Sequence, residues 1–299
     1  MQKKTVFYGG IAAASMLVII LDAKTAVMSA AEGVELCLRT LIPSLFPFFV
    51  LSGVINSCLL GQQIRLLRPL GRICKIPVGA ESLLLLGFLA GYPVGAQLIA
   101  QAYREGKLSR NSAGRMLGFC NNAGPSFVFG MLTPLFASVR TVWVLWGVHI
   151  LSALIIGWLL PVTSLENCRI APGKTLTPTE SIQRAMKALG MVCGWVVIFR
   201  VILGFCQRWF LWYFSDSISV VFSGLLELAN GCVLLSKIPS EWMRFLLASG
   251  MLAFGGVCVG MQTISVTGGM GTGRYFPGKL LQTAVAVLLC LFLRPIIFS

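Results

Sequence analysis

A carboxylate inside an apolar run is the residue of this chain with the clearest chemical potential. Glu227 lies in SVVFSGLLELANGCVLLSK, three residues before Asn230. A charged side chain at membrane depth costs at least about 2.5 kcal/mol, so it needs a partner or a polar cavity. Glu227 can therefore hold a cation, a proton or a substrate hydroxyl. The structural alternative is an ion pair with Arg200 or Arg39.

Two Gly/Pro interruptions lie in apolar surroundings in the first half of the chain. The first is Gly91-Tyr92-Pro93-Val94-Gly95, and the second is Asn121-Asn122-Ala123-Gly124-Pro125. Irregular backbone at membrane depth persists only where it is buried in protein or lines a polar cavity. We therefore predict that both breaks contribute to a solute site. The alternative is a pair of packing kinks, since Gly and Pro are common in membrane helices.

The second half contains two further breaks, at residues 227–231 and 255–262. Half-helix N-termini at such breaks attract anions, and unwound carbonyls hold cations. We expect all four breaks to converge near the membrane midplane. The candidate substrate-binding residues are Gly91, Tyr92, Pro93, Gly95, Gln97, Asn121, Asn122, Ser126, Glu227, Asn230, Gly255, Gly256 and Gln262.

Composition identifies an integral membrane protein. Of the 299 residues, 57% are hydrophobic and 11% are charged, and the mean hydropathy is +0.85, far outside the range of soluble domains. The net charge is +14, but the cations flank apolar runs with little aromatic interleaving. We therefore expect a lipid bilayer and no nucleic acid as partner. The ten cysteines show no metal-type spacing with His149, so no metal site is expected.

The apolar runs predict an all-α polytopic membrane protein with about seven spans and two re-entrant hairpins. A hairpin over residues 82–103 carries GYPVG at its tip, and a second is broken near Glu227. The expected spans are residues 5–21, 34–58, 109–136, 141–160 and 277–298, and two more that begin near Pro178 and after Ser240. Thr177 and Glu180 have capping-box spacing at the start of the first of these two.

The two halves repeat one another in outline. An offset of 148 aligns residues 34–55 with residues 182–203, and three crossings separate them, so the second repeat is inverted. We divide the chain into an N-terminal transmembrane segment, 1–30, a first repeat, 31–160, a cytoplasmic linker, 161–177, and a second repeat, 178–299.

Charge predicts the orientation in the membrane. With a cytoplasmic N-terminus, inside segments hold fourteen cations, Lys279 among them, and outside segments hold four. That asymmetry follows the positive-inside rule. Residues 61–79, with Arg65, Arg68, Arg72 and Lys75, resemble an interfacial amphipathic helix.

Enzymatic chemistry has no support in the sequence. No Ser/His/Asp set, paired acids or metal cluster is visible, so we expect neither an enzyme nor a cofactor. The run Gly268 to Gly273 lacks the Lys-Ser/Thr ending of a phosphate loop and is interpreted as a flexible loop. We interpret His149 as a helix–helix hydrogen-bonding residue rather than a proton relay.

Four motifs resemble a known family. LIPSLFPFFVLSGVI, GFLAGYPVGAQLIAQAYREGKLS, FCNNAGPSFVFG and LAFGGVCVGMQ are similar to those of sporulation integral membrane proteins of the YlbJ type, in the nucleoside-recognition (Gate) domain group. That group is similar in architecture to concentrative nucleoside transporters. The first hairpin tip here lacks the Gln-Thr-Glu run with which those transporters read a base.

The resemblance implies a transporter of a small anionic metabolite, dipicolinic acid, across the outer forespore membrane during sporulation. The runner-up is a nucleoside or nucleobase carrier coupled to Na⁺ or H⁺. A third alternative is a membrane scaffold in spore-envelope assembly that transports nothing. A small-molecule substrate and a homo-oligomer are the remaining candidate partners.

Overall fold

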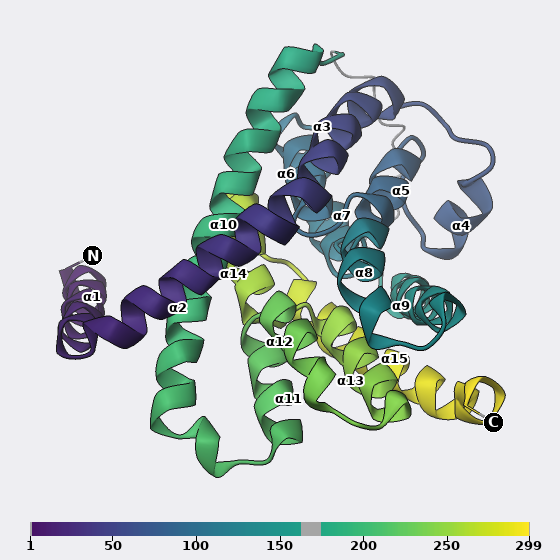
Figure 1. Cartoon of the computed structure of the whole chain (residues 1–299). Coiled ribbons are helices and arrows are strands. Elements are labelled where there is room, and N and C mark those ends of the chain that lie inside the picture. Colours follow the sequence, from purple (N-terminus) through teal and green to yellow (C-terminus); the bar gives the residue numbers. More distant parts are fainter. Residues whose placement is uncertain (1, 163–174, 299) are drawn as a thin grey trace.

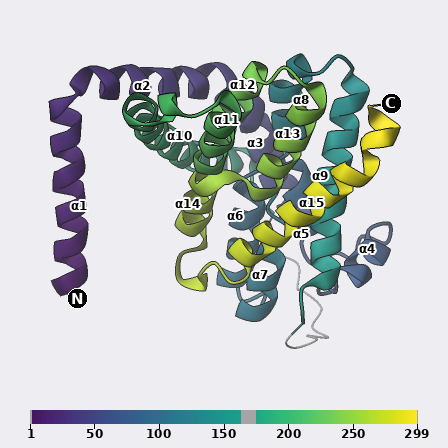
Figure 2. The same ribbon diagram turned by 90° about the horizontal axis from the view of Figure 1, so that it is seen from below.

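The computed structural model describes residues 2–162 and 175–298, and this part of the chain is helical with connecting turns. Most of the predicted linker, with Arg169 and Lys174, lies outside the described residues. The helices form one body, and α1 (Gln2–Leu21) stands apart from it beyond the start of α2 (Ala23–Leu36) (Figure 1, Figure 2).

Two long helices cross one side of the body. α2 continues through a π-helical turn, Cys37–Leu41, into α3 (Ile42–Leu59), so residues 23–59 form one helical rod. Pro47 lies inside α3, where its ring removes a backbone donor. α10 (Pro178–Trp209) packs along this rod. The predicted capping box starts α10, since Thr177 accepts from the Glu180 backbone and Glu180 caps in return.

The first hairpin consists of α5 (Glu81–Leu89) and α6 (Val94–Arg104), with GYPVG at its tip as predicted. The prediction of an amphipathic helix over residues 61–79 is wrong about its length, because α4 covers only Arg68–Ile73. The helix ends because Lys75 takes a positive φ of 51° and Pro77 follows.

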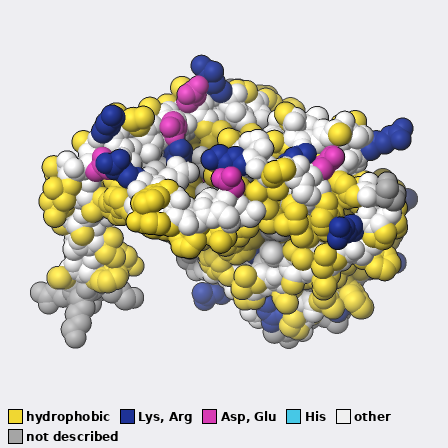
Figure 3. All heavy atoms as spheres, turned by 60° about the horizontal axis from the view of Figure 1, so that its bottom comes forward, with side chains coloured by type: hydrophobic (Ala, Val, Ile, Leu, Met, Phe, Trp, Pro, Cys, Tyr) yellow, Lys and Arg dark blue, Asp and Glu magenta, His cyan; other side chains and the backbone are white. Residues whose placement is uncertain are grey.

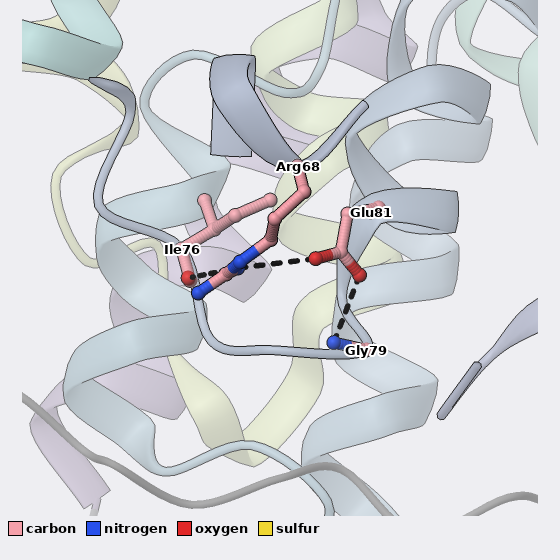
Figure 4. Close-up of polar contacts among 4 residues, drawn as sticks. All are labelled: Arg68, Ile76, Gly79 and Glu81. Atoms are coloured by element: carbon pink, nitrogen blue, oxygen red, sulfur yellow. Dashed lines mark hydrogen bonds and ion pairs between the residues drawn. The ribbon is translucent and has the colours of Figure 1, made fainter. Parts of the chain in front are cut away.

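A buried ion pair ties α4 to the start of the hairpin. The Arg68 Nη1 lies 3.0 Å from Glu81 Oε1 and 3.4 Å from the Ile76 carbonyl. The other Glu81 oxygen accepts from the Gly79 backbone at 2.8 Å (Figure 4). Glu81 is fully buried, so Arg68 and the Gly79 amide together satisfy its charge.

The remaining elements follow the same order in both halves. A broken helix, α7 (Arg110–Leu117) and α8 (Pro125–Leu132), precedes α9 (Val139–Leu159). The second half continues with the hairpin α11 (Asp216–Leu226) and α12 (Leu228–Leu234). It ends with the broken helix α13 (Glu241–Phe254) and α14 (Gly256–Thr267), and with α15 (Tyr275–Ile297). Short 3₁₀ turns cover Thr133–Leu135, Leu211–Tyr213, Leu235–Lys237 and Gly268–Met270.

Among residues 2–162 and 175–298, five helical segments are long and apolar enough to cross a membrane. They are Ala23–Leu59, Val139–Leu159, Pro178–Trp209, Glu241–Met270 and Tyr275–Ile297. Of the seven predicted spans, the other two correspond to the shorter apolar α1 and to the interrupted pair α7 and α8. Hydrophobic side chains cover much of one face, and charged side chains lie mostly across its upper part, with further Lys and Arg near its lower edge (Figure 3). The protein is a multi-pass integral membrane protein.

Candidate functional site

The four chain breaks meet around one small cavity of about 40 Å³. Room on this scale holds only a few water molecules. Each break contributes residues to the wall of the cavity: Gly91 and Tyr92 from the first, Ala123 and Gly124 from the second, Glu227 to Ala229 from the third, and Val259 and Gln262 from the fourth. Its apolar lining comes from Leu41, Leu45, Phe127, Val192 and Val196. Segments far apart in the sequence therefore form one site between the two halves.

Glycine lets each hairpin tip approach the helix break that follows it. Gly91 has φ +84°, and a Cβ on it would lie 3.1 Å from the Gly124 backbone nitrogen. In the second half Gly256, also at φ +84°, would place a Cβ 3.1 Å from the Gly224 carbonyl oxygen. Neither position tolerates a side chain without strain, because L residues disfavour this backbone region.

Glu227 caps the helix that it precedes. Its Oε1 accepts from the Ala229 backbone at 3.1 Å, and its Oε2 accepts from the Asn230 backbone and from Asn230 Nδ2, both at 2.7 Å. The expected alternative partners are engaged elsewhere, since Arg39 pairs with Glu35 and Arg200 with Glu32. The first backbone amides of α12 thus stabilise the Glu227 carboxylate. The side chain also borders the cavity.

Lys279 is the main functional candidate that sequence reasoning missed. Counting it as a cytoplasmic topology cation is wrong, because the side chain is fully buried in α15. Its Nζ donates to Gln282 Oε1 at 2.8 Å, to Asn122 Oδ1 at 3.0 Å and to Tyr92 Oη at 3.3 Å. It also lies 5.2 Å from the centroid of the Tyr92 ring. All these partners are neutral, and none of the five ion pairs among the described residues includes Lys279.

A hydrogen-bond network extends from Lys279 to α9. Gln282 Nε2 donates to Asn122 Oδ1 at 3.1 Å and to the His149 carbonyl at 3.3 Å. The Ala123 backbone donates to His149 Nε2 at 3.1 Å, which requires a neutral imidazole with its proton on Nδ1. His149 therefore joins α9 to the first broken helix, as its interpretation as a helix–helix contact predicts.

Two side chains tie the first half to the second. Tyr92 donates from Oη to the Leu252 carbonyl at 2.9 Å, near the end of α13. Asn121 accepts from the Ala96 backbone at 3.2 Å and donates to Thr263 Oγ1 at 3.0 Å in α14. The first hairpin is therefore fixed to the second broken helix by side-chain hydrogen bonds.

Of the thirteen predicted site residues, Gly91, Tyr92, Glu227 and Gln262 line the cavity. The others support it or lie away from it. Pro93 starts α6, and Gly95 packs against the Cys120 carbonyl and Asn121. Gln97 lines a separate cavity of about 20 Å³ beside Arg184.

The remaining predicted residues surround the breaks. Asn121 donates a hydrogen bond to Thr263 in α14, and Asn122 accepts one from Lys279 in α15. Asn230 donates to the Glu227 carboxylate. The Oγ of Ser126 is buried, without a hydrogen-bond partner in the described part of the chain. Gly255, at φ +83°, would place a Cβ 3.2 Å from the Tyr92 ring, and Gly256 packs beside Leu228.

Sequence spacing contained one signal for the missed residues. Lys279 and Gln282 are three residues apart in α15, so they share a helix face. Gly278 precedes them, and a Cβ there would lie 2.4 Å from the Gly118 carbonyl oxygen. This close contact points the polar face of α15 at the first broken helix.

Comparison with known proteins identifies one informative relative. The chain is similar to the sporulation integral membrane protein YlbJ of Bacillus subtilis (strain 168), with 24% identity in an alignment of 311 positions that covers 87% of this chain and 76% of the relative. No family model and no solved structure matches the chain. The predicted resemblance to proteins of the YlbJ type is thereby confirmed.

Proposed function

We propose that this protein is a transporter for a small anionic metabolite. The observation that carries the proposal is the fully buried ammonium group of Lys279, which has only neutral hydrogen-bond partners among the described residues. An uncompensated charge inside a membrane protein is costly and marks functional sites. Lys279 does not line the cavity itself, but its hydrogen-bond partner Tyr92 does, so an anion in the cavity stabilises the charged form of Lys279 across the Tyr92 ring.

The helix ends around the cavity also favour a negatively charged solute. The Glu227 carboxylate is engaged by the first backbone amides of α12, so it offsets that helix end rather than Lys279. The N-terminal ends of α8 and α14 also begin at the breaks around the site, and helix N-termini favour negative charge. These helix ends add partial positive charge around a cavity whose lining, within the described chain, contains the Glu227 carboxylate and no Lys or Arg.

The described conformation leaves little room for a solute. A cavity of about 40 Å³ is far below the roughly 300 Å³ at which drug-sized ligand sites begin. Binding therefore requires the hairpin tips to separate from the breaks they contact. Relative movement of two helical repeats around a central site is the usual form of alternating access.

The relative's name supports a role in sporulation. We propose that the chain acts in a spore-forming bacterium and moves dipicolinic acid into the forespore across the outer forespore membrane, as the motif resemblance implies. An aromatic dicarboxylate combines two negative charges with a ring that can contact Tyr92 and Phe127 beside the cavity.

A nucleoside carrier is the second candidate function. Glu227 and Gln262 both line the cavity, and a carboxylate with an amide can bind the hydroxyls and base of a neutral solute. Coupling to Na⁺ or H⁺ belongs to this alternative. A scaffold that transports nothing is the third, and it predicts no ligand at all.

Ligand-dependent thermal stabilisation of the purified protein separates these candidates. Dipicolinate, uridine and an unrelated aliphatic dicarboxylate are added in turn, and the melting temperature is measured. We expect dipicolinate to raise it most and the aliphatic dicarboxylate less. Stabilisation by uridine alone overturns the anion proposal, and no response to any of the three favours the scaffold.

A further inference from the structure

A further cavity lies at the surface, between the start of α7 and the loop that joins α14 to α15. Its volume is about 310 Å³, within the size range of ligand sites. Its polar side chains are Arg110, Asn111, Arg115, Thr272 and Arg274. No Asp or Glu of the described chain lines it. The start of α7 and this loop both lie toward the lower edge of Figure 2.

Neutral backbone oxygens hold the three arginines in place. Arg115 is buried and donates to the carbonyls of Cys74 at 2.7 Å and Leu160 at 3.1 Å, and to that of Gly157. Arg110 Nε donates to the Met270 carbonyl at 3.2 Å. Arg274 donates to the carbonyl of Pro161. Within residues 2–162 and 175–298 none of the three forms an ion pair, so no carboxylate of these residues neutralises their charge.

The glycine-rich loop is fixed against α7. The Arg274 backbone donates to the Gly114 carbonyl at 3.0 Å. Gly273 has φ +53°, and a Cβ on it would lie 2.4 Å from the Gly114 Cα. Only glycine permits this contact. The loop expected to be flexible therefore forms a defined wall of the cavity.

The cavity lies at the junction of two candidate membrane spans. Residues 271–274 join the candidate spans Glu241–Met270 and Tyr275–Ile297, so they lie where the chain leaves the apolar region. The planar guanidinium group of arginine can donate two parallel hydrogen bonds to phosphate oxygens, so it matches phosphate in geometry as well as in charge. Basic pockets between membrane helices bind anionic lipid head groups by this chemistry.

We propose that this cavity is a binding site for a phosphate group, held by Arg110 and Arg274 with Arg115 as the buried charge behind them. The source is an anionic phospholipid head group or a soluble phosphate ester, which share the same chemistry. The site is separate from the central cavity and does not depend on which solute the protein transports.

The test uses the full-length purified protein and measures its melting temperature as a function of phosphate source. The probes are inorganic phosphate in detergent, and nanodiscs of phosphatidylcholine with or without phosphatidylglycerol. We expect stabilisation by phosphate, by phosphatidylglycerol over phosphatidylcholine, or by both, and the pattern identifies the source. The proposal is overturned if neither inorganic phosphate nor phosphatidylglycerol stabilises the protein.

Variants then assign the effect to the cavity. In the double variant Arg110→Gln/Arg274→Gln the apparent affinity for the stabilising probe is expected to fall at least about tenfold, since two charge-assisted contacts are lost. The matched control is Arg65→Gln/Arg72→Gln, which removes the same charge from exposed residues outside the cavity. An equal loss in the control means general surface attraction and overturns the proposal.

A further variant guards against loss of folding. Arg110→Gln alone alters an exposed side chain, so its melting temperature without ligand is expected to match that of the wild type. It is expected to weaken the response to the probe several-fold. An unchanged response in this folded variant also contradicts the assignment.

Discussion

Replacing Lys279 with methionine tests the central proposal most directly. Methionine keeps much of the side-chain length and removes the charge that Tyr92, Asn122 and Gln282 surround. The Lys279 Nζ lies 5.2 Å from the Tyr92 ring centroid. An anion touching the opposite side of the ring is then roughly 9 Å away, and at an effective dielectric constant of about 20 the attraction is about 2 kcal/mol. The affinity for an anion should therefore fall roughly thirtyfold.

Stability should change much less than affinity in this variant. Gln282 Oε1 loses the donor 2.8 Å away, and an unsatisfied buried acceptor costs about 1–3 kcal/mol. Removing a buried charge that lacks an opposite charge offsets this cost. The free energy of unfolding of Lys279→Met is therefore expected to lie within about 2 kcal/mol of that of the wild type.

The assay is equilibrium binding of dipicolinate and of uridine to the reconstituted protein. Lys187→Met is the matched control, because Lys187 is exposed on α10 and its removal should change neither affinity. The reasoning is refuted if Lys279→Met binds dipicolinate as tightly as the wild type. An equal loss for uridine would show that Lys279 only shapes the cavity.

Three further predictions concern the elements around the site. Glu227→Gln should abolish transport in an uptake assay while protein abundance in the membrane is retained, because a neutral amide binds the first backbone amides of α12 less strongly and loosens the hairpin tip beside the cavity. Loss of the folded protein would show that the cap of α12 is its main role. Arg68→Met leaves the Glu81 carboxylate buried without its partner and should lower the free energy of unfolding by about 3 kcal/mol, measured by denaturant titration. Gly124→Ala places a Cβ 2.9 Å from the backbone nitrogen of the first hairpin tip and should cost about 1–3 kcal/mol. Gly130→Ala, which meets nothing within 4 Å, is its control in thermal unfolding.

The sequence by itself determined the class of the protein and the location of its breaks. Long apolar runs can only be satisfied as helices in a bilayer, because lipid offers backbone groups no hydrogen bonds. Local chemistry also fixed several ends. Proline and glycine interrupt the helices at Gly91 to Pro93 and at Gly255, and the capping box starts α10. These are short-range effects, so a single sequence contains them.

Only the tertiary structure decided which polar groups meet. Lys279 lies near a helix end, where a lysine usually reaches water, and the sequence cannot tell that Gly278 brings α15 against Gly118 and buries the ammonium. Glu227 was recognised as an important carboxylate, yet its partner is the backbone two and three residues ahead rather than an arginine. The arginines around the glycine-rich loop come together in the same way, through the packing of α7 against residues 271–274. Local pattern specifies where a helix begins and ends, whereas long-range packing decides which charges remain without an opposite charge.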